Sequence, residues 1–227
     1  MYKVSESIWT IPLFPLETVL FPYTALPLHI FEPRYREMIM HCLETDSLFG
    51  VVLIREGREV GDPEVQVYEI GTLARIGRLR RQPDGRLHLL AIGEERFQIV
   101  RILRHEAPYL KAHVRLWRDL EPLDWDAELQ YAEEVAQRFR EFLRIALAAG
   151  GLRLEGIELP RNPTALSFAI AGTLQLETPL RQYLLELQDA RERLRLVDQI
   201  LQTLMSAFAS EIQPYNPEHW REYVNPN

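Results

Sequence analysis

The first 118 residues contain short apolar segments that are separated by proline, glycine and other turn residues. Most of these segments alternate between apolar and polar positions, which is typical of strands with one buried face. Leu48 to Ile54 is a continuous apolar run and indicates a strand that is buried on both faces. The predicted strands are Ile8 to Phe14, Leu26 to Phe31, Leu48 to Ile54, Val65 to Glu69, Gly71 to Leu79, Arg86 to Ile92, Phe97 to Leu103 and Tyr109 to Trp117.

Two turns are predicted between the later strands. Pro83-Asp84-Gly85 predicts a hairpin, because proline presets one backbone dihedral and glycine accepts a positive one. Glu94-Glu95 could suggest paired acids, but consecutive strand residues face opposite sides of a sheet. We therefore expect Glu94-Glu95 to form a turn between two strands.

One helix is predicted among these strands, over about Pro33 to Leu43. Proline is well tolerated at the first helical position, where its missing N–H has no acceptor to lose. His41 and Cys42 could suggest a nucleophile and its base, but adjacent helical residues do not face one another. We predict instead that Cys42 is buried and that His41 is exposed.

From Trp125 onward, apolar residues recur at steps of three and four, which indicates helices. The first predicted helix ends at Gly150-Gly151, and the second begins at Pro163 and is apolar on nearly every side. A third begins at Thr178-Pro179. A fourth follows Asp189, which resembles a cap, and its apolar stripe reaches Phe208.

These patterns predict an α+β protein with two parts and a tail. Residues 1–120 form a small barrel or rolled sheet with one helix, and residues 121–212 form a helical bundle. Residues 213–227 are rich in proline and asparagine and are predicted to be a tail.

Composition excludes several classes of protein. The chain has 47% hydrophobic and 26% charged residues, as globular proteins do, and its lone cysteine excludes an internal disulfide framework. No segment resembles a signal peptide, and none approaches the roughly 20 apolar residues of a membrane-spanning helix. We therefore expect a cytoplasmic protein with no membrane association. No two of the six histidines lie within four residues of each other, so no metal site or cofactor is predicted.

Two stretches resemble the substrate-recognition region of the Lon protease family (ATP-dependent protease La). Ile11 to Arg36 reads IPLFPLETVLFPYTALPLHIFEPRYR and is similar to the opening of the Lon N-terminal domain. LFGVVL, GTLARI and DGRLHLLAIGEERFQI then follow in the order that the family shows. Leu184 to Leu201 resembles the helical segment that follows the domain in full-length Lon. The resemblance implies a barrel of the PUA-like type.

The resemblance also implies recognition of polypeptides without catalysis. The sequence has no Gly-Lys pair for a phosphate-binding loop, and Lys3 and Lys111 are its only lysines for a serine–lysine dyad. We therefore expect a free-standing, non-enzymatic member without the ATPase and protease modules. Such a protein would bind exposed apolar segments of unfolded polypeptides in an apolar groove rimmed by arginines, and would act as an adaptor for a protease or ATPase partner. The groove would lie on the barrel or at its junction with the bundle.

The segment Pro27 to Arg36 supplies the candidate substrate-binding residues. In one interpretation Phe31, Arg34 and Tyr35 contribute to a peptide-binding face. In the other, the segment stabilises the corner between strand and helix, and its charged residues pair locally.

A basic block leaves a second function open. The net charge is -7, yet residues 72–118 carry 11 basic and 4 acidic side chains. Arg78, Arg80 and Arg81 belong to this block and could bind RNA through its phosphates. Aromatic residues that could stack on bases are scarce there, which favours polypeptide binding.

Overall fold

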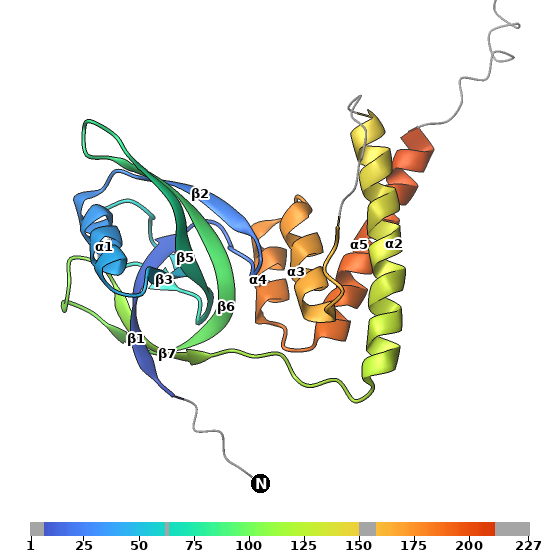
Figure 1. The fold of residues 1–227 in the computed structure, drawn as a ribbon, viewed down its shortest axis with the longest axis horizontal. Helices are drawn as coiled ribbons and strands as arrows, with labels where there is room; N and C mark the ends of the chain where they lie inside the picture. The colour runs from blue at the N-terminus through green and yellow to red at the C-terminus, as the bar shows by residue number, and fades with distance from the viewer. Residues whose placement is uncertain (1–6, 62–63, 150–157, 212–227) are drawn as a thin grey trace, which may run out of the picture.

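The computed structural model describes residues 7–61, 64–149 and 158–211 of the chain (Figure 1). A β-rich unit comes first and a helical unit second, as the sequence predicts. The elements are β1 Trp9–Leu16, β2 Ala25–Ile30, α1 Pro33–Glu44, β3 Leu48–Glu56, β4 Gln66–Val67, β5 Ile70–Arg81, β6 Leu87–Leu103, β7 Lys111–Leu116, α2 Trp125–Ala149, α3 Pro163–Thr173, α4 Thr178–Glu186 and α5 Ala190–Glu211. The predicted cap at Gly150-Gly151 and the predicted tail, residues 213–227, lie outside the described residues.

The strands roll into a closed sheet. Neighbours follow the order β1-β7-β6-β5-β3, and β1 also pairs with β3, which closes the ring. The β1–β3 pairing is parallel and the other pairings are antiparallel. β2 adds to one end of β6, and β4 adds to β3. Figure 1 shows α1 over the barrel on the side away from the other helices.

The predicted turn at Glu94-Glu95 is wrong, because β6 runs without a break from Leu87 to Leu103. β6 pairs with β5 from Leu87 to Gln98. Its other edge pairs with β2 from Leu87 to Ile92 and with β7 from Phe97 to Leu103. Gly93 allows this course. A Cβ atom at Gly93 would lie 2.2 Å from the carbonyl oxygen of Phe21, so the β1–β2 loop packs directly on the strand.

Three buried clusters fill the molecule. One lies between α1 and the sheet and includes Met38, Ile39 and Cys42, and a second fills the other end of the barrel around Phe97. The burial of Cys42 and the exposure of His41 confirm the prediction for this pair. The third cluster joins Phe21 of the β1–β2 loop and the strand residues Leu53 and Ile70 to α2, α3, α4 and α5. The central helix α3 is buried on most sides, as its sequence predicts.

α4 joins the helical unit to the barrel through hydrogen bonds to backbone groups. Gln182 donates to the Ile70 carbonyl at 3.1 Å, and Arg181 donates to the Val19 carbonyl at 3.0 Å. In return, the indole N–H of Trp117 donates to the carbonyl of Glu186 at 2.9 Å. These bonds fix the two units against each other, so the surface between them has a defined shape.

A buried ionic cluster lies at the same junction. Asp119 accepts hydrogen bonds from Arg96 of β6, from Arg193 of α5 and from Thr164 of α3. Both guanidinium groups also lie over the ring of Phe168, with distances to the ring centre of 5.2 and 3.9 Å. Burial lowers the pKa of Arg96 to about 10, although Asp119 opposes this shift. One carboxylate therefore connects a strand and two helices.

Among the helices that the structure describes, none combines the length and the apolar character needed to cross a membrane.

Candidate functional site

A large hollow lies at the junction of the two units. It is a groove of about 850 Å³. One wall is the segment 118–125, which leads from the barrel to α2, and the other wall is formed by the first residues of α3 and α5. Figure 1 shows this connecting segment running past the ends of the helices before it turns into α2. We call this hollow the junction groove.

Large apolar side chains are exposed along the junction groove. Leu123 is fully exposed, Leu120 is 64% exposed, and Trp125 is 47% exposed. Tyr23 reaches the groove from the β1–β2 loop and is 60% exposed. Scattered apolar residues are normal on a protein surface, but a contiguous group that lines a groove is typical of a binding site.

Tyr23 is held in an unusual backbone conformation. Its φ is 64°, in the left-handed region that side chains other than glycine rarely adopt. The Tyr23 N–H donates to the Gly93 carbonyl at 2.8 Å, and the Gly93 N–H donates to the Thr24 carbonyl at 2.9 Å. These two bonds offset a conformation that otherwise costs about 1 kcal/mol or more. They also fix the position from which Tyr23 presents its ring to the junction groove.

A second, smaller hollow of about 220 Å³ extends the groove beyond Tyr23. The two hollows share Tyr23, Arg118, Asp119 and Thr164. The extension reaches Glu94 and Glu95 on β6, the pair that sequence reasoning assigned to a turn. The groove and its extension therefore adjoin at the residues that they share.

Three helices begin beside the junction groove. Asp124, Asn162 and Asp189 cap α2, α3 and α5, and each accepts a backbone N–H of the first turn, at 3.1, 3.0 and 2.9 Å. The cap predicted at Asp189 is thus present. Arg118 and Arg191 line the groove as well, so arginines do border it. The site offers apolar surface, charge and hydrogen-bonding groups.

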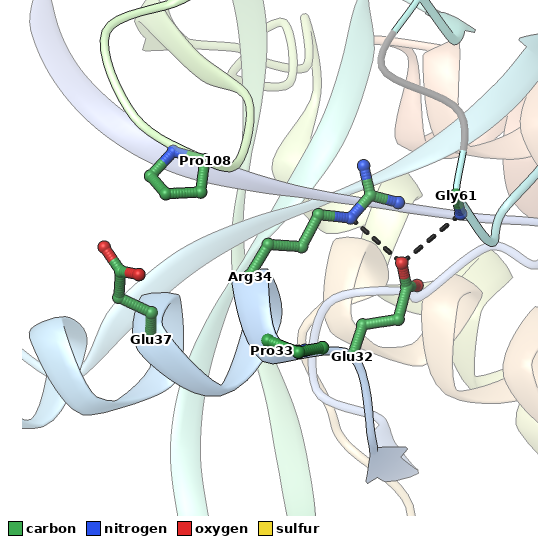
Figure 2. A pocket seen from close by; sticks show the side chains of 6 residues that line it. All are labelled: Glu32, Pro33, Arg34, Glu37, Gly61 and Pro108. Atoms are coloured by element: carbon green, nitrogen blue, oxygen red, sulfur yellow. Dashed lines mark hydrogen bonds and ion pairs between the residues drawn. The ribbon is translucent and has the colours of Figure 1, made fainter.

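The predicted substrate-binding residues lie elsewhere, at the corner between β2 and α1. A pocket of about 540 Å³ lies there. Figure 2 shows its lining, with Arg34 and Glu32 pointing toward one another. Arg34 donates to the Glu32 carboxylate at 3.1 Å, and the same carboxylate accepts the Gly61 N–H at 3.3 Å. Arg34 also lies 4.5 Å from the ring centre of Tyr35. Arg34 and Glu32 therefore pair with each other at this corner.

The three predicted residues of this corner differ in accessibility. Phe31 is 48% exposed, whereas Tyr35 is 4% exposed and packs against Phe14 with 4.3 Å between ring centres. Burial raises the pKa of Tyr35 to about 12. Phe31 and Arg34 can meet a ligand here, and Tyr35 belongs to the core beneath them.

The arginines of the alternative RNA site lie on β5 and are exposed. Arg80 pairs in register with His88 of β6, and Arg81 contacts the sulfur of Met40 at 3.0 Å. The three residues Arg78, Arg80 and Arg81 therefore stay together near the β5–β6 hairpin. Neither they nor the corner residues line the junction groove.

Sequence reasoning placed a groove at the junction as one option but named none of its residues. A signal was present in the connecting segment, where Leu120, Pro122 and Leu123 interrupt a run of acidic residues. Apolar residues in a polar connection have no core to enter, so they point to a surface role.

Comparison with known proteins gives the family. The model of the ATP-dependent protease La (Lon) substrate-binding domain matches residues 10–203. The chain belongs to this family. A Lon protease 2 of Herpetosiphon aurantiacus is 31% identical over 204 residues, and a Lon protease of Anaeromyxobacter dehalogenans is 26% identical over 193 residues. Both alignments cover 84% of this chain, which spans 23% of the length of each relative.

Solved structures of Lon N-terminal domains share the fold. A Lon N-terminal domain protein from Xanthomonas campestris is 26% identical, with a TM-score of 0.61 over 84% of this chain and 97% of that one. The N-terminal domain of a Mycobacterium avium complex Lon protease is 19% identical, with a TM-score of 0.62 over 86% and 98% of the two chains. The predicted architecture, a rolled sheet with one helix followed by packed helices, is thereby confirmed.

Proposed function

We propose that this protein binds exposed apolar segments of unfolded polypeptides in the junction groove. The observation that carries the proposal is the row of exposed apolar side chains, Tyr23, Leu120, Leu123 and Trp125, along one continuous hollow. Burying such side chains against a ligand is favourable by about 1.5–3 kcal/mol each. The family's description as a substrate-binding domain of an ATP-dependent protease supports the same role.

The proposed role includes no chemistry on the bound segment. The protein would hold the segment as an adaptor for a protease or ATPase partner. The family match supports this part of the proposal, because it covers a substrate-binding domain.

The test is fluorescence anisotropy with a labelled, permanently unfolded polypeptide. We expect Leu123→Ser combined with Trp125→Ala to weaken binding about tenfold or more, because both side chains are exposed and available to a ligand. Binding by the unmodified protein should survive moderate salt, since apolar burial is not screened. Val100→Ser is the matched control, because Val100 is 50% exposed on β6 and lines neither the groove nor its extension.

Equal affinity for the polypeptide in the double variant and the unmodified protein would contradict the proposal. If Arg34→Ala or Phe31→Ala weakened binding instead, the binding site would be assigned to the corner between β2 and α1 shown in Figure 2.

A further inference from the structure

We infer that the junction groove selects apolar segments that carry a lysine or arginine, and that Glu128 receives this basic side chain. The inference rests on the proposed function, because it names which polypeptides the same groove prefers. The observations that support it are a buried carboxylate oxygen without a partner and the charge of the lining residues.

Glu128 is the acidic residue with the least exposure in the groove lining. It lies in the first turn of α2, and its side chain is 5% exposed. Its Oε2 atom accepts a hydrogen bond from Arg191 at 3.2 Å, whereas its Oε1 atom is buried and has no hydrogen-bond partner. Carboxylates that are removed from water normally have their oxygens hydrogen-bonded, because an unsatisfied buried acceptor is costly.

Arg191 leaves room for a second donor. Its side chain is 53% exposed, and its guanidinium lies over the ring of Tyr131 at 5.0 Å from the ring centre. The guanidinium therefore meets Glu128 from one side only. An ionised carboxylate accepts several hydrogen bonds, so a basic side chain from a ligand can bind Oε1 while Arg191 stays on Oε2.

The charges of the lining residues also favour a basic ligand. The residues that line the groove and its extension include seven acidic and three basic side chains; the acidic ones are Glu94, Glu95, Asp119, Glu121, Asp124, Glu128 and Asp189. Asp119 is balanced by its two buried arginines, and Glu94 pairs with Arg75. The caps Asp124 and Asp189 offset the positive ends of α2 and α5. Of these seven carboxylates, Glu128 is the one that combines burial with an oxygen atom that has no hydrogen-bond partner.

The pKa of Tyr23 indicates the sign of the electrostatic potential where the groove meets its extension. Burial raises the pKa of Tyr23, and the negative charges of Glu95 and Asp119 raise it further. The opposing effects of Arg193 and Arg96 are smaller. A cationic group passing Tyr23 therefore meets a negative environment.

The experiment uses three labelled peptides with the same apolar residues and with lysine, glutamine or glutamate at two flanking positions. We expect the lysine peptide to bind about tenfold more tightly than the glutamine peptide, as one charge-assisted hydrogen bond provides. The glutamate peptide should bind most weakly. In Glu128→Gln, the difference between the lysine and glutamine peptides should fall to about twofold, while the glutamine peptide keeps its affinity.

Two further variants distinguish a specific effect of Glu128 from an effect of net charge and from an effect of unfolding. Glu141→Gln removes an exposed carboxylate of α2 that lines neither the groove nor its extension, so it should change the lysine preference by no more than about twofold. Arg191→Gln frees the second oxygen of Glu128, so it should increase the preference for lysine. This opposite change cannot result from unfolding.

The outcomes distinguish the two proposals. Failure of the polypeptide-binding function would appear as no binding of any peptide, or as binding that Leu123→Ser leaves unchanged. The lysine inference alone fails if Leu123→Ser weakens binding but lysine gives no advantage, or if its advantage survives in Glu128→Gln. Peptide binding that requires removal of residues 212–227, or that competes with self-association, would assign the groove to this chain itself and overturn the inference.

Discussion

The surroundings of Cys42 make its thiol unreactive in the folded protein. It lies between α1 and the sheet and is 1% exposed. Burial raises the pKa of its thiol to about 12, and the negative charge of Asp46 acts in the same direction. The thiolate, which is the reactive form of cysteine, is therefore scarce in the folded protein at neutral pH. The neighbouring His41 points elsewhere and does not change this.

The raised pKa of Cys42 predicts a loss of stability at alkaline pH. The unfolded thiol has the ordinary pKa of 9.0 and the folded thiol a pKa of about 12, so this contribution is complete below pH 9 and is lost as the pH rises toward 12. Between pH 8 and pH 11 we expect the unmodified protein to lose roughly 2 kcal/mol more than Cys42→Ala in denaturant unfolding. Below pH 8 the two stability curves should run parallel. Stability curves that stay parallel up to pH 11 would contradict the raised pKa of the Cys42 thiol.

At the scale of elements, the junction depends on one carboxylate in a connecting segment. Asp119 binds Arg96 of β6, Arg193 of α5 and Thr164 of α3, so it adds to the direct contacts between these elements. The two arginine side chains are 3% and 0% exposed, so neither can recover water if the carboxylate is removed. The connecting segment therefore has a structural role as well as lining the groove.

We expect Asp119→Asn to destabilise the fold by about 3–5 kcal/mol, because it leaves two buried guanidinium groups without a counter-charge. Asp126→Asn is the control, since Asp126 is exposed at the start of α2, and it should change stability by less than about 0.5 kcal/mol. Urea unfolding measures both. Equal stability of the two variants would show that the arginines find other partners.

The same cluster explains where sequence reasoning failed. The residues Gly93-Glu94-Glu95-Arg96 interrupt an apolar pattern, which is typical of a turn. The strand continues through them because Gly93 pairs with the β1–β2 loop and because Arg96 is neutralised by Asp119, 23 residues later. Neither cause is visible in the local pattern. The strong period of α2 and the continuous apolar runs of α3 and β3 made these elements predictable, because their own residues determine their burial.

At the scale of the molecule, the candidate site could be predicted only in part. Tyr23, the segment 118–125, α3 and α5 are far apart in sequence and meet only when the helical unit packs on the barrel. The predicted corner residues Phe31 and Arg34 lie in one short segment that resembles the family, so they could be named from the sequence. Groove residues carry no comparable local signal except Leu120 and Leu123.

The basic block also looks different in three dimensions. Five of its eleven basic side chains, Arg75, Arg86, Arg96, Arg104 and Lys111, form ion pairs with acidic residues, and Arg96 is buried. These pairs reduce the positive charge that residues 72–118 present to a ligand.

We therefore expect binding to single-stranded RNA to be no tighter than non-specific electrostatic contacts, about 10⁻⁴–10⁻⁶ M at physiological salt. Anisotropy titrations at about 50 and 200 mM salt measure this, with Arg80→Glu combined with Arg81→Glu as the variant. Tight RNA binding that this variant abolishes would favour the RNA function over polypeptide binding.

The wall of the junction groove is also the strap that joins the two halves of the protein. Leu120 and Leu123 stand in the segment whose Asp119 binds both halves, and the Leu120 N–H donates to the carbonyl of Gln188, just before α5. Under the proposed function, traction on a chain held in the groove would pass into this segment and from there into the barrel and α5 together. The barrel and the helical unit would therefore resist such traction jointly.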